Sequence, residues 1–276
     1  MIETEYAGHI TNLADKACTE KYESFFVMGG DGSVSEAITA LAEKKDKPKF
    51  GLLPLGTVND LARALGIDLD PLKSIEELDL TKTLSLDVAK VNDRYFSNIL
   101  TAGSIPKAVK DTFIEEKSKF GKIAYVINGF KALQDSEPLK YEVNLDGESF
   151  KIQTSLLGVT VSGAMSTFCD FFKKINPSDG KLAIFYSKDQ SVFDMILGFP
   201  EALGGLENET DHIGYKEFEN ASIKLLSEKE VGVTIDGDEG VRFPLEIKIL
   251  KGELKYINKI MTTRIAGGFL CMTGMF

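Results

Sequence analysis

The first 80 residues alternate between short apolar runs and segments with helical periodicity. Apolar residues recur at helical spacing over 10–22, and the aromatic and β-branched run at 25–28 predicts a strand. A second strand is predicted over 49–53 and a second strand-linked helix over 57–65. Strands that alternate with helices are typical of a parallel sheet, so we expect an α/β domain here.

The pattern changes after about residue 80, where apolar and polar residues begin to alternate as in strands with one buried face. One amphipathic helix is predicted over 120–133, and Asp146-Gly147 predicts a tight hairpin. We expect an α/β chain of two domains: a parallel-sheet domain over 1–82 and a mainly antiparallel, β-sandwich-like domain over 83–249. The segment from about residue 250 is free to pack back onto the first domain. Strands are predicted over 84–88, 95–100, 141–145, 150–154, 155–162, 181–187, 221–226, 231–235 and 244–250.

Three glycines within four positions follow the first strand, at Gly29, Gly30 and Gly32. They permit positive φ and let a ligand approach the backbone closely. Ser33 is predicted to cap the next helix with Glu36 as its capping-box partner. Free N–H groups at a helix N-terminus favour anions, so we expect a phosphate at this turn.

Asp31 changes what this turn implies, because a carboxylate repels phosphate unless a cation lies between them. The turn therefore predicts a metal–nucleotide site. The alternative is an ordinary strand-to-helix turn in which Asp31 bonds its own backbone. A second glycine turn at 54–56 precedes a helix for which Thr57 and Asp60 predict another capping box. Both turns follow parallel strands, at the sheet edge where such folds bind ligands.

Charge and cysteine content narrow the class of protein. The net charge is −10, which argues against nucleic acid as a partner. Three widely spaced cysteines indicate neither a disulfide framework nor a zinc site. The first residues do not resemble a secretory signal, so we expect a cytoplasmic protein that meets membranes peripherally.

The two glycine blocks together, Gly29-Gly30-Asp31-Gly32-Ser33 and Pro54-Leu55-Gly56-Thr57-Val58-Asn59-Asp60, resemble the diacylglycerol kinase catalytic family, specifically the bacterial soluble lipid kinases. The first block alone also occurs in phosphofructokinases and NAD kinases, whereas the second is typical of the lipid kinases. The similarity covers roughly residues 5 to 257 and continues through 86–88, 95–98, 120–125, 176–180, 235–238 and 243–247.

The resemblance implies a kinase that uses ATP and Mg²⁺ to phosphorylate a lipid hydroxyl at the membrane surface. Diacylglycerol is the expected acceptor and phosphatidic acid the product, a step of phospholipid biosynthesis, and a homodimer is one option. The alternative from another functional class is a catalytically inactive family member that only binds lipid or nucleotide. An NAD or sugar kinase is a further alternative, which the 54–60 block disfavours.

The resemblance also assigns roles to individual residues. An acidic cluster near the nucleotide magnesium matches Asp31, Asp60 and Asp87, and Asp236 and Asp238 fall on an Asp-Gly-Glu motif that carries the family's proposed catalytic base. A second, structural metal site matches Asp179 with the backbone carbonyls of Asn176 and Lys181. The nucleotide contacts match Gly29, Gly30, Asp31, Gly32, Ser33, Val34, Ser35, Thr57, Asn59 and Asp60.

The chain departs from the family in two places. Asp238 stands where Glu is usual, and the family ordinarily begins with a strand, an Asn-Pro motif and a helix, so we expect that first strand–helix unit to be missing. Structural roles remain open for three of the acidic residues. Asp60 is also a capping residue, Asp87 is also compatible with a solvated strand face, and Asp179 lies in a turn that needs no metal.

Overall fold

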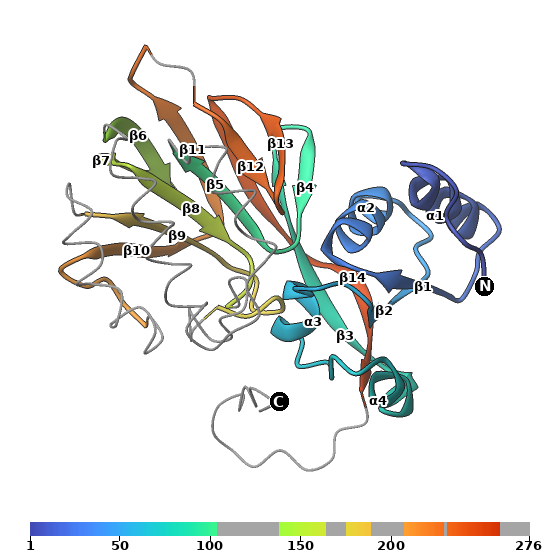
Figure 1. The fold of residues 1–276 in the computed structure, drawn as a ribbon. Coiled ribbons are helices and arrows are strands. Elements are labelled where there is room, and N and C mark those ends of the chain that lie inside the picture. Colours follow the sequence, from blue (N-terminus) through green and yellow to red (C-terminus); the bar gives the residue numbers. More distant parts are fainter. Residues whose placement is uncertain (104–137, 164–174, 189–206, 229–230, 260–276) are drawn as a thin grey trace.

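The computed structural model describes residues 1–103, 138–163, 175–188, 207–228 and 231–259 (Figure 1). Its helices are α1 (His9–Thr19), α2 (Asp31–Leu41), α3 (Asp60–Ala64) and α4 (Pro71–Glu76). Its strands are β1 (Ser24–Gly29), β2 (Lys49–Pro54), β3 (Leu78–Val91), β4 (Arg94–Phe96), β5 (Ile99–Gly103), β6 (Leu139–Leu145), β7 (Glu148–Thr154), β8 (Leu156–Thr160), β9 (Leu182–Ser187), β10 (Ile213–Phe218), β11 (Asn220–Leu225), β12 (Val233–Ile235), β13 (Asp238–Val241) and β14 (Leu245–Lys259). The helix predicted over 120–133 lies outside the described residues.

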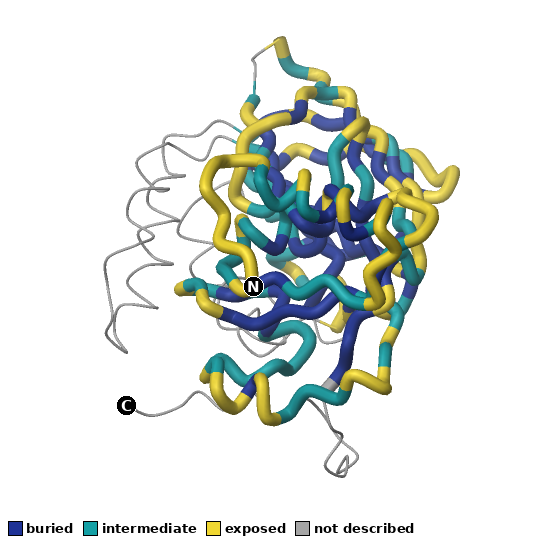
Figure 2. Tube along the Cα trace, turned by 90° about the vertical axis from the view of Figure 1, so that its right-hand side faces the viewer, coloured by how far each residue is buried: buried dark blue, intermediate teal, exposed yellow. Residues whose placement is uncertain are grey.

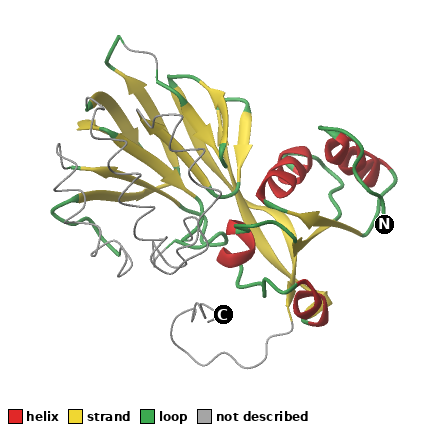
Figure 3. Ribbon diagram, in the orientation of Figure 1, coloured by secondary structure: helices red, strands yellow, loops and turns green. Residues whose placement is uncertain are grey.

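The N-terminal part has the α/β arrangement predicted from its apolar pattern. β1 and β2 pair in parallel, with Phe25 opposite Phe50. α1 packs on α2 and α2 on β1, while α3 and α4 contact β2. One hydrophobic core forms where they meet, and it includes the fully buried Leu41 and Phe50. Figure 3 shows that the helices lie at one end of the molecule and that the other end is built of strands.

Two long strands join this end to the rest. β3 and β14 pair antiparallel, and Tyr256 of β14 also pairs in parallel with Phe50 of β2. Leu86 and Leu254 belong to the core of the α/β lobe, whereas Ala89 belongs to the core of the sandwich. Because both strands cross from one core into the other, the predicted limits of 1–82 and 83–249 stay a prediction.

The second lobe is a sandwich of two sheets. The six-stranded sheet has the order β10-β9-β8-β5-β12-β13 and is antiparallel throughout. The eight-stranded sheet places β14, β11, β6 and β7 against it, and buried residues fill the interior (Figure 2). The predicted hairpin between β6 and β7 is confirmed, with positive φ at Asp146 (49°) and Gly147 (96°). The expected mainly antiparallel sandwich is therefore present.

One predicted strand is wrong. The run 95–100 is divided into β4 and β5, which lie in different sheets. The chain leaves one sheet here because the N–H groups of Ser97, Asn98 and Ile99 all donate to the carboxylate of Asp236. Among the described helices, none is long and apolar enough to cross a membrane.

Candidate functional site

The two glycine turns meet backbone against backbone. A Cβ placed on Gly56 would lie 2.4 Å from the Cα of Gly30, and one on Gly30 would lie 3.1 Å from the Cα of Gly56. The N–H of Leu55 donates to the carbonyl of Gly29 at 3.0 Å. Glycine is therefore required at both contact points, and the turns after β1 and β2 form one continuous edge.

Asp31 joins these turns through its side chain. Its carboxylate accepts the backbone N–H of Asn59 at 2.9 Å and that of Asp60 at 2.7 Å. Asp31 therefore occupies the N-terminus of α2 while its side chain caps the neighbouring helix α3. The alternative in which Asp31 bonds its own turn is not what the structure shows.

Both predicted capping boxes are wrong. α2 begins at Asp31 with Gly30 as its N-cap, two residues before Ser33, and no side chain caps it. Glu36 instead accepts from the backbone N–H and the hydroxyl of Thr11, which ties α2 to α1. A partner far away in the sequence replaces the expected local one.

α3 also begins later than predicted, at Asp60, with Asn59 as its N-cap. Asn59 has a φ of 55°, in the left-handed region that asparagine tolerates better than most residues. Its side chain bonds the N–H of Gly56 at 2.9 Å and the carbonyl of Gly56 at 2.8 Å. Asn59 thus holds the second turn closed, and the exposed Thr57 makes no capping bond to α3.

The carboxylate of Asp60 points away from its own helix, toward the β lobe. Its Oδ2 accepts from Nδ2 of Asn98 at 2.9 Å. Asn98 follows β4 and precedes β5, so this bond links the glycine turns to the second sheet. Asn98 is not among the site residues predicted from the sequence, although the 95–98 block that carries the family resemblance contains it.

Asp236 is held by its surroundings on several sides. Its carboxylate accepts from the N–H groups of Ser97, Asn98 and Ile99 at 3.0, 3.1 and 2.9 Å. Burial raises the pKa of this carboxyl, and the surrounding N–H donors act in the opposite direction. The side chain positions the chain between β4 and β5.

Asp238, the second residue matched to the Asp-Gly-Glu motif, has a different environment. It is exposed and is the first residue of β13, immediately beyond the turn at Asp236 and Gly237. Gly237 has a φ of 95°, which directs the chain sharply back into the sheet. Within the described part of the chain, the Asp238 carboxylate makes no hydrogen bond or ion pair, so it can accept a proton from a ligand.

Asp87 and Asp179 lie together in another part of the molecule. Asp87 is 2% exposed, so the alternative of a solvated strand face is wrong, and its carboxylate accepts from the N–H of Gly180 (2.6 Å) and of Gly252 (2.7 Å). Gly252 lies at a register shift between β3 and β14, which turns its N–H inward. Asp179 accepts from the N–H groups of Asn176 and Lys181, as an Asx turn does.

The predicted metal ligands thus form two separate pairs. Within the described residues, no group of three or more His, Cys, Asp or Glu side chains is placed to hold a metal ion. Mg²⁺ on a nucleotide ordinarily needs only one or two carboxylates, since phosphate oxygens and waters complete its shell. Asp31 and Asp60 are the candidates for that role, because the backbone N–H of Asp60 bonds the Asp31 carboxylate at the glycine edge and so places the two residues side by side.

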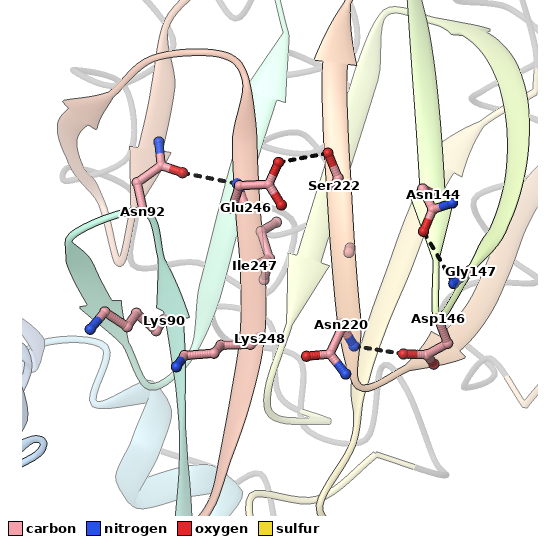
Figure 4. Close-up of a pocket in the computed structure, with 11 residues that line it drawn as sticks. Lys90, Asn92, Asn144, Asp146, Gly147, Asn220, Ser222, Glu246, Ile247 and Lys248 are labelled. Carbon is pink, nitrogen blue, oxygen red and sulfur yellow. Dashed lines mark hydrogen bonds between the residues drawn. The ribbon is translucent and has the colours of Figure 1, made fainter.

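A polar groove of about 660 Å³ lies on the outer face of the eight-stranded sheet, over β3, β14, β11 and β6 (Figure 4). None of the predicted site residues lines it. Glu246 accepts from Ser222 there, and Asp146 accepts from the N–H of Asn220. Its acidic groups are thus engaged within the sheet, and we place the candidate site at the glycine edge.

Family models match both parts of the chain. The diacylglycerol kinase catalytic domain matches residues 1–91, and the YegS C-terminal NAD kinase beta sandwich-like domain matches residues 104–258. The first match contains both glycine turns, and the second contains Asp179, Asp236 and Asp238.

Individual relatives agree with these models. A Streptococcus pneumoniae protein named "Putative lipid kinase" is 34% identical over 258 residues, which cover 93% of this chain and 85% of the relative. A Staphylococcus aureus diacylglycerol kinase is 28% identical over 241 residues, covering 87% and 76%. A solved structure described as "A putative diacylglycerol kinase from Bacillus anthracis str. Sterne" superposes with a TM-score of 0.78 at 26% identity, covering 93% of this chain and 85% of that one. The chain therefore belongs to the diacylglycerol kinase family and is a lipid kinase, a phosphotransferase.

Proposed function

We propose that this lipid kinase transfers the γ-phosphoryl group of ATP to the free hydroxyl of diacylglycerol at a membrane surface, producing phosphatidic acid and ADP. The observation that carries the proposal is the pair of glycine turns locked together by Asp31, at the carboxyl ends of two parallel strands. That edge is where open α/β sheets bind ligands.

The N-terminus of α2 supplies the phosphate contacts in this proposal. The N–H groups of residues 30–33 lie at the positive end of an eleven-residue helix, which favours an anion. A Cβ on Gly32 would meet no atom within 4 Å, so phosphate has room to approach the backbone there. Mg²⁺, held by the phosphates with Asp31 and Asp60, would offset the charge that develops during transfer.

Asp238 is the residue we propose as the proton acceptor. Phosphorylation of a hydroxyl releases its proton, and a carboxylate within hydrogen-bond reach can receive it. Asp236 already accepts from three backbone N–H groups, so its carboxylate is committed to positioning the strands. Asp238, which is exposed, is available to a lipid that enters from solvent or a bilayer.

A radiolabel assay tests the proposal. Purified protein, γ-labelled ATP and Mg²⁺ are incubated with diacylglycerol in mixed micelles and, in parallel, with NAD or fructose 6-phosphate. We expect label only in the lipid, and excess chelator to abolish its transfer. Faster labelling of either soluble acceptor would overturn the substrate class. Binding of ATP without transfer to any lipid alcohol would favour an inactive member of the family, for which Asp238→Glu is the first variant to examine.

A further inference from the structure

Asn98 has a side-chain environment that only an amide can satisfy. It is 7% exposed, and its Oδ1 accepts from the hydroxyl of Ser162 at 2.6 Å. Its Nδ2 donates to Oδ2 of Asp60 at 2.9 Å. Since a carboxylate can only accept, the amide nitrogen must face Asp60. This position therefore requires a side chain that donates a hydrogen bond toward Asp60 and accepts one from Ser162.

The backbone of Asn98 is held as firmly as its side chain. Its N–H donates to the carboxylate of Asp236 at 3.1 Å, and its carbonyl accepts both from the N–H of Val161 and from the hydroxyl of Thr160, each at 3.0 Å. Thr160 is the last residue of β8, Val161 follows it directly, and Asp236 lies in the turn before β13, all at the six-stranded sheet. Asn98 is thus fixed to the β lobe and reaches out from it to the α/β lobe.

Asp60 is bonded to both lobes. Its backbone N–H donates to Asp31 at the glycine edge, and its carboxylate receives the amide of Asn98. A shift of one lobe against the other would break one of these bonds.

We propose that Asn98 is a positioning residue for phosphoryl transfer, which orients the Asp60 carboxylate and couples the β lobe that receives the lipid to the lobe that holds the nucleotide. The inference rests on the proposed function of Asp60 at the nucleotide magnesium. Asn98 touches neither substrate; it acts through Asp60. Residues that orient a metal-binding carboxylate typically matter about 10- to 100-fold in metal affinity or activity.

Asn98→Asp is the informative variant, because it keeps the shape and the acceptor for Ser162 but replaces the donor. Two carboxylates then face each other, and their repulsion turns the Asp60 carboxylate out of position. We expect kcat to fall about 10- to 100-fold and the Mg²⁺ concentration needed for half-maximal rate to rise, while the KM for the lipid stays at the wild-type value.

Asn144→Asp is the matched control. It makes the same chemical change on β6, where Asn144 contacts Ser149 and Gly147 in the polar groove. We expect its kcat and its Mg²⁺ dependence to match those of wild type. Thermal midpoints of all three proteins correct the rates for folded fraction.

The affinity for Mg-ATP, measured by calorimetry, separates this proposal from the proposed function. If wild type phosphorylates no lipid, the proposed function fails, and a weaker Mg-ATP affinity in Asn98→Asp than in Asn144→Asp would still support the role of Asn98. A loss of rate that leaves the Mg²⁺ dependence unchanged, or that matches the loss of folded protein, makes Asn98 purely structural and overturns the proposal. Wild-type rates and affinity in Asn98→Asp overturn it as well.

Discussion

Two pairs of carboxylates in this molecule lie beside glycine turns, and they are used differently. Asp31 caps a helix of the neighbouring turn, and Asp60 reaches the other lobe through Asn98. Within the described residues, Asp87 and Asp179 accept backbone N–H groups alone, and they tie the turn at 176–181 to β3 and β14. The first pair thus includes a bond between the lobes, whereas the second pair holds the strand crossing together.

The largest effect that would test this contrast is expected at Asp31. In Asp31→Asn one oxygen becomes an N–H₂ group, so one of the two N–H groups of α3 loses its acceptor and the negative charge is lost. We expect kcat for phosphoryl transfer to fall about 10²- to 10³-fold. Loss of the helix cap should also lower the free energy of unfolding by about 1 kcal/mol. Initial rates and thermal unfolding measure the two effects.

The control for Asp31→Asn is Asp211→Asn, the same change at an exposed position before β10, which should keep both rate and midpoint. If Asp31→Asn lost activity only in proportion to unfolded protein, Asp31 would belong with the structural pair and the contrast would disappear.

At Asp87 we expect the opposite of Asp31: a larger loss of stability and a smaller loss of kcat. In Asp87→Asn an amide N–H₂ group meets the N–H of Gly180 or Gly252, and a buried donor is left unsatisfied, at a cost of about 1–3 kcal/mol. The free energy of unfolding, from denaturant titration, should therefore fall more than in Asp31→Asn, and kcat per folded molecule should fall less. The opposite order would place Asp87 functionally with Asp31 and Asp60, as the family resemblance implies.

Short-range patterns predicted the parallel strands, the hairpin at Asp146-Gly147 and the glycine turns, because each depends on residues that are neighbours in sequence. The two predicted capping boxes were wrong because they, too, were read from neighbouring residues, whereas the actual partners are distant in sequence. Asp31 caps α3 from 28 and 29 positions away, and Glu36 bonds Thr11 at a separation of 25. Local spacing contains no information about such partners.

The elements that were not predicted are short or polar. β13 has four residues, of which three are exposed, and β10 contains Gly214 and Lys216 among its apolar positions. α4 did carry a signal, since Asp70 before Pro71 is a strong helix start and the Asp70 side chain does cap it. Asn98 was inside a recognised block, yet its role depends on Asp60, 38 positions earlier, and so appears only in the folded chain.

The smallest effect concerns Asp179, whose pKa is raised above its ordinary value, first by burial and further by the charges of Asp87 and Glu217, against the lowering effect of two N–H donors. A carboxyl with a raised pKa in the folded state contributes stability below its unfolded pKa, near 3.9, and loses that contribution as the pH rises through the folded value. Asp179→Asn removes the titration. The free energy of unfolding of wild type minus that of the variant should therefore decrease as the pH rises above about 4.

The same pair of proteins tests the structural metal site. A divalent cation bound by Asp179 with the carbonyls of Asn176 and Lys181 would neutralise the charge that burial disfavours, because a nearby cation favours the ionised carboxyl. We expect millimolar Mg²⁺ or Ca²⁺ at pH 7 to raise the thermal midpoint of wild type, to leave that of Asp179→Asn unchanged, and to flatten the pH dependence of their difference. Equal responses of both proteins to the cation would leave Asp179 as a residue that caps its own turn. A difference in free energy of unfolding, wild type minus variant, that grows with pH would contradict a raised pKa of Asp179.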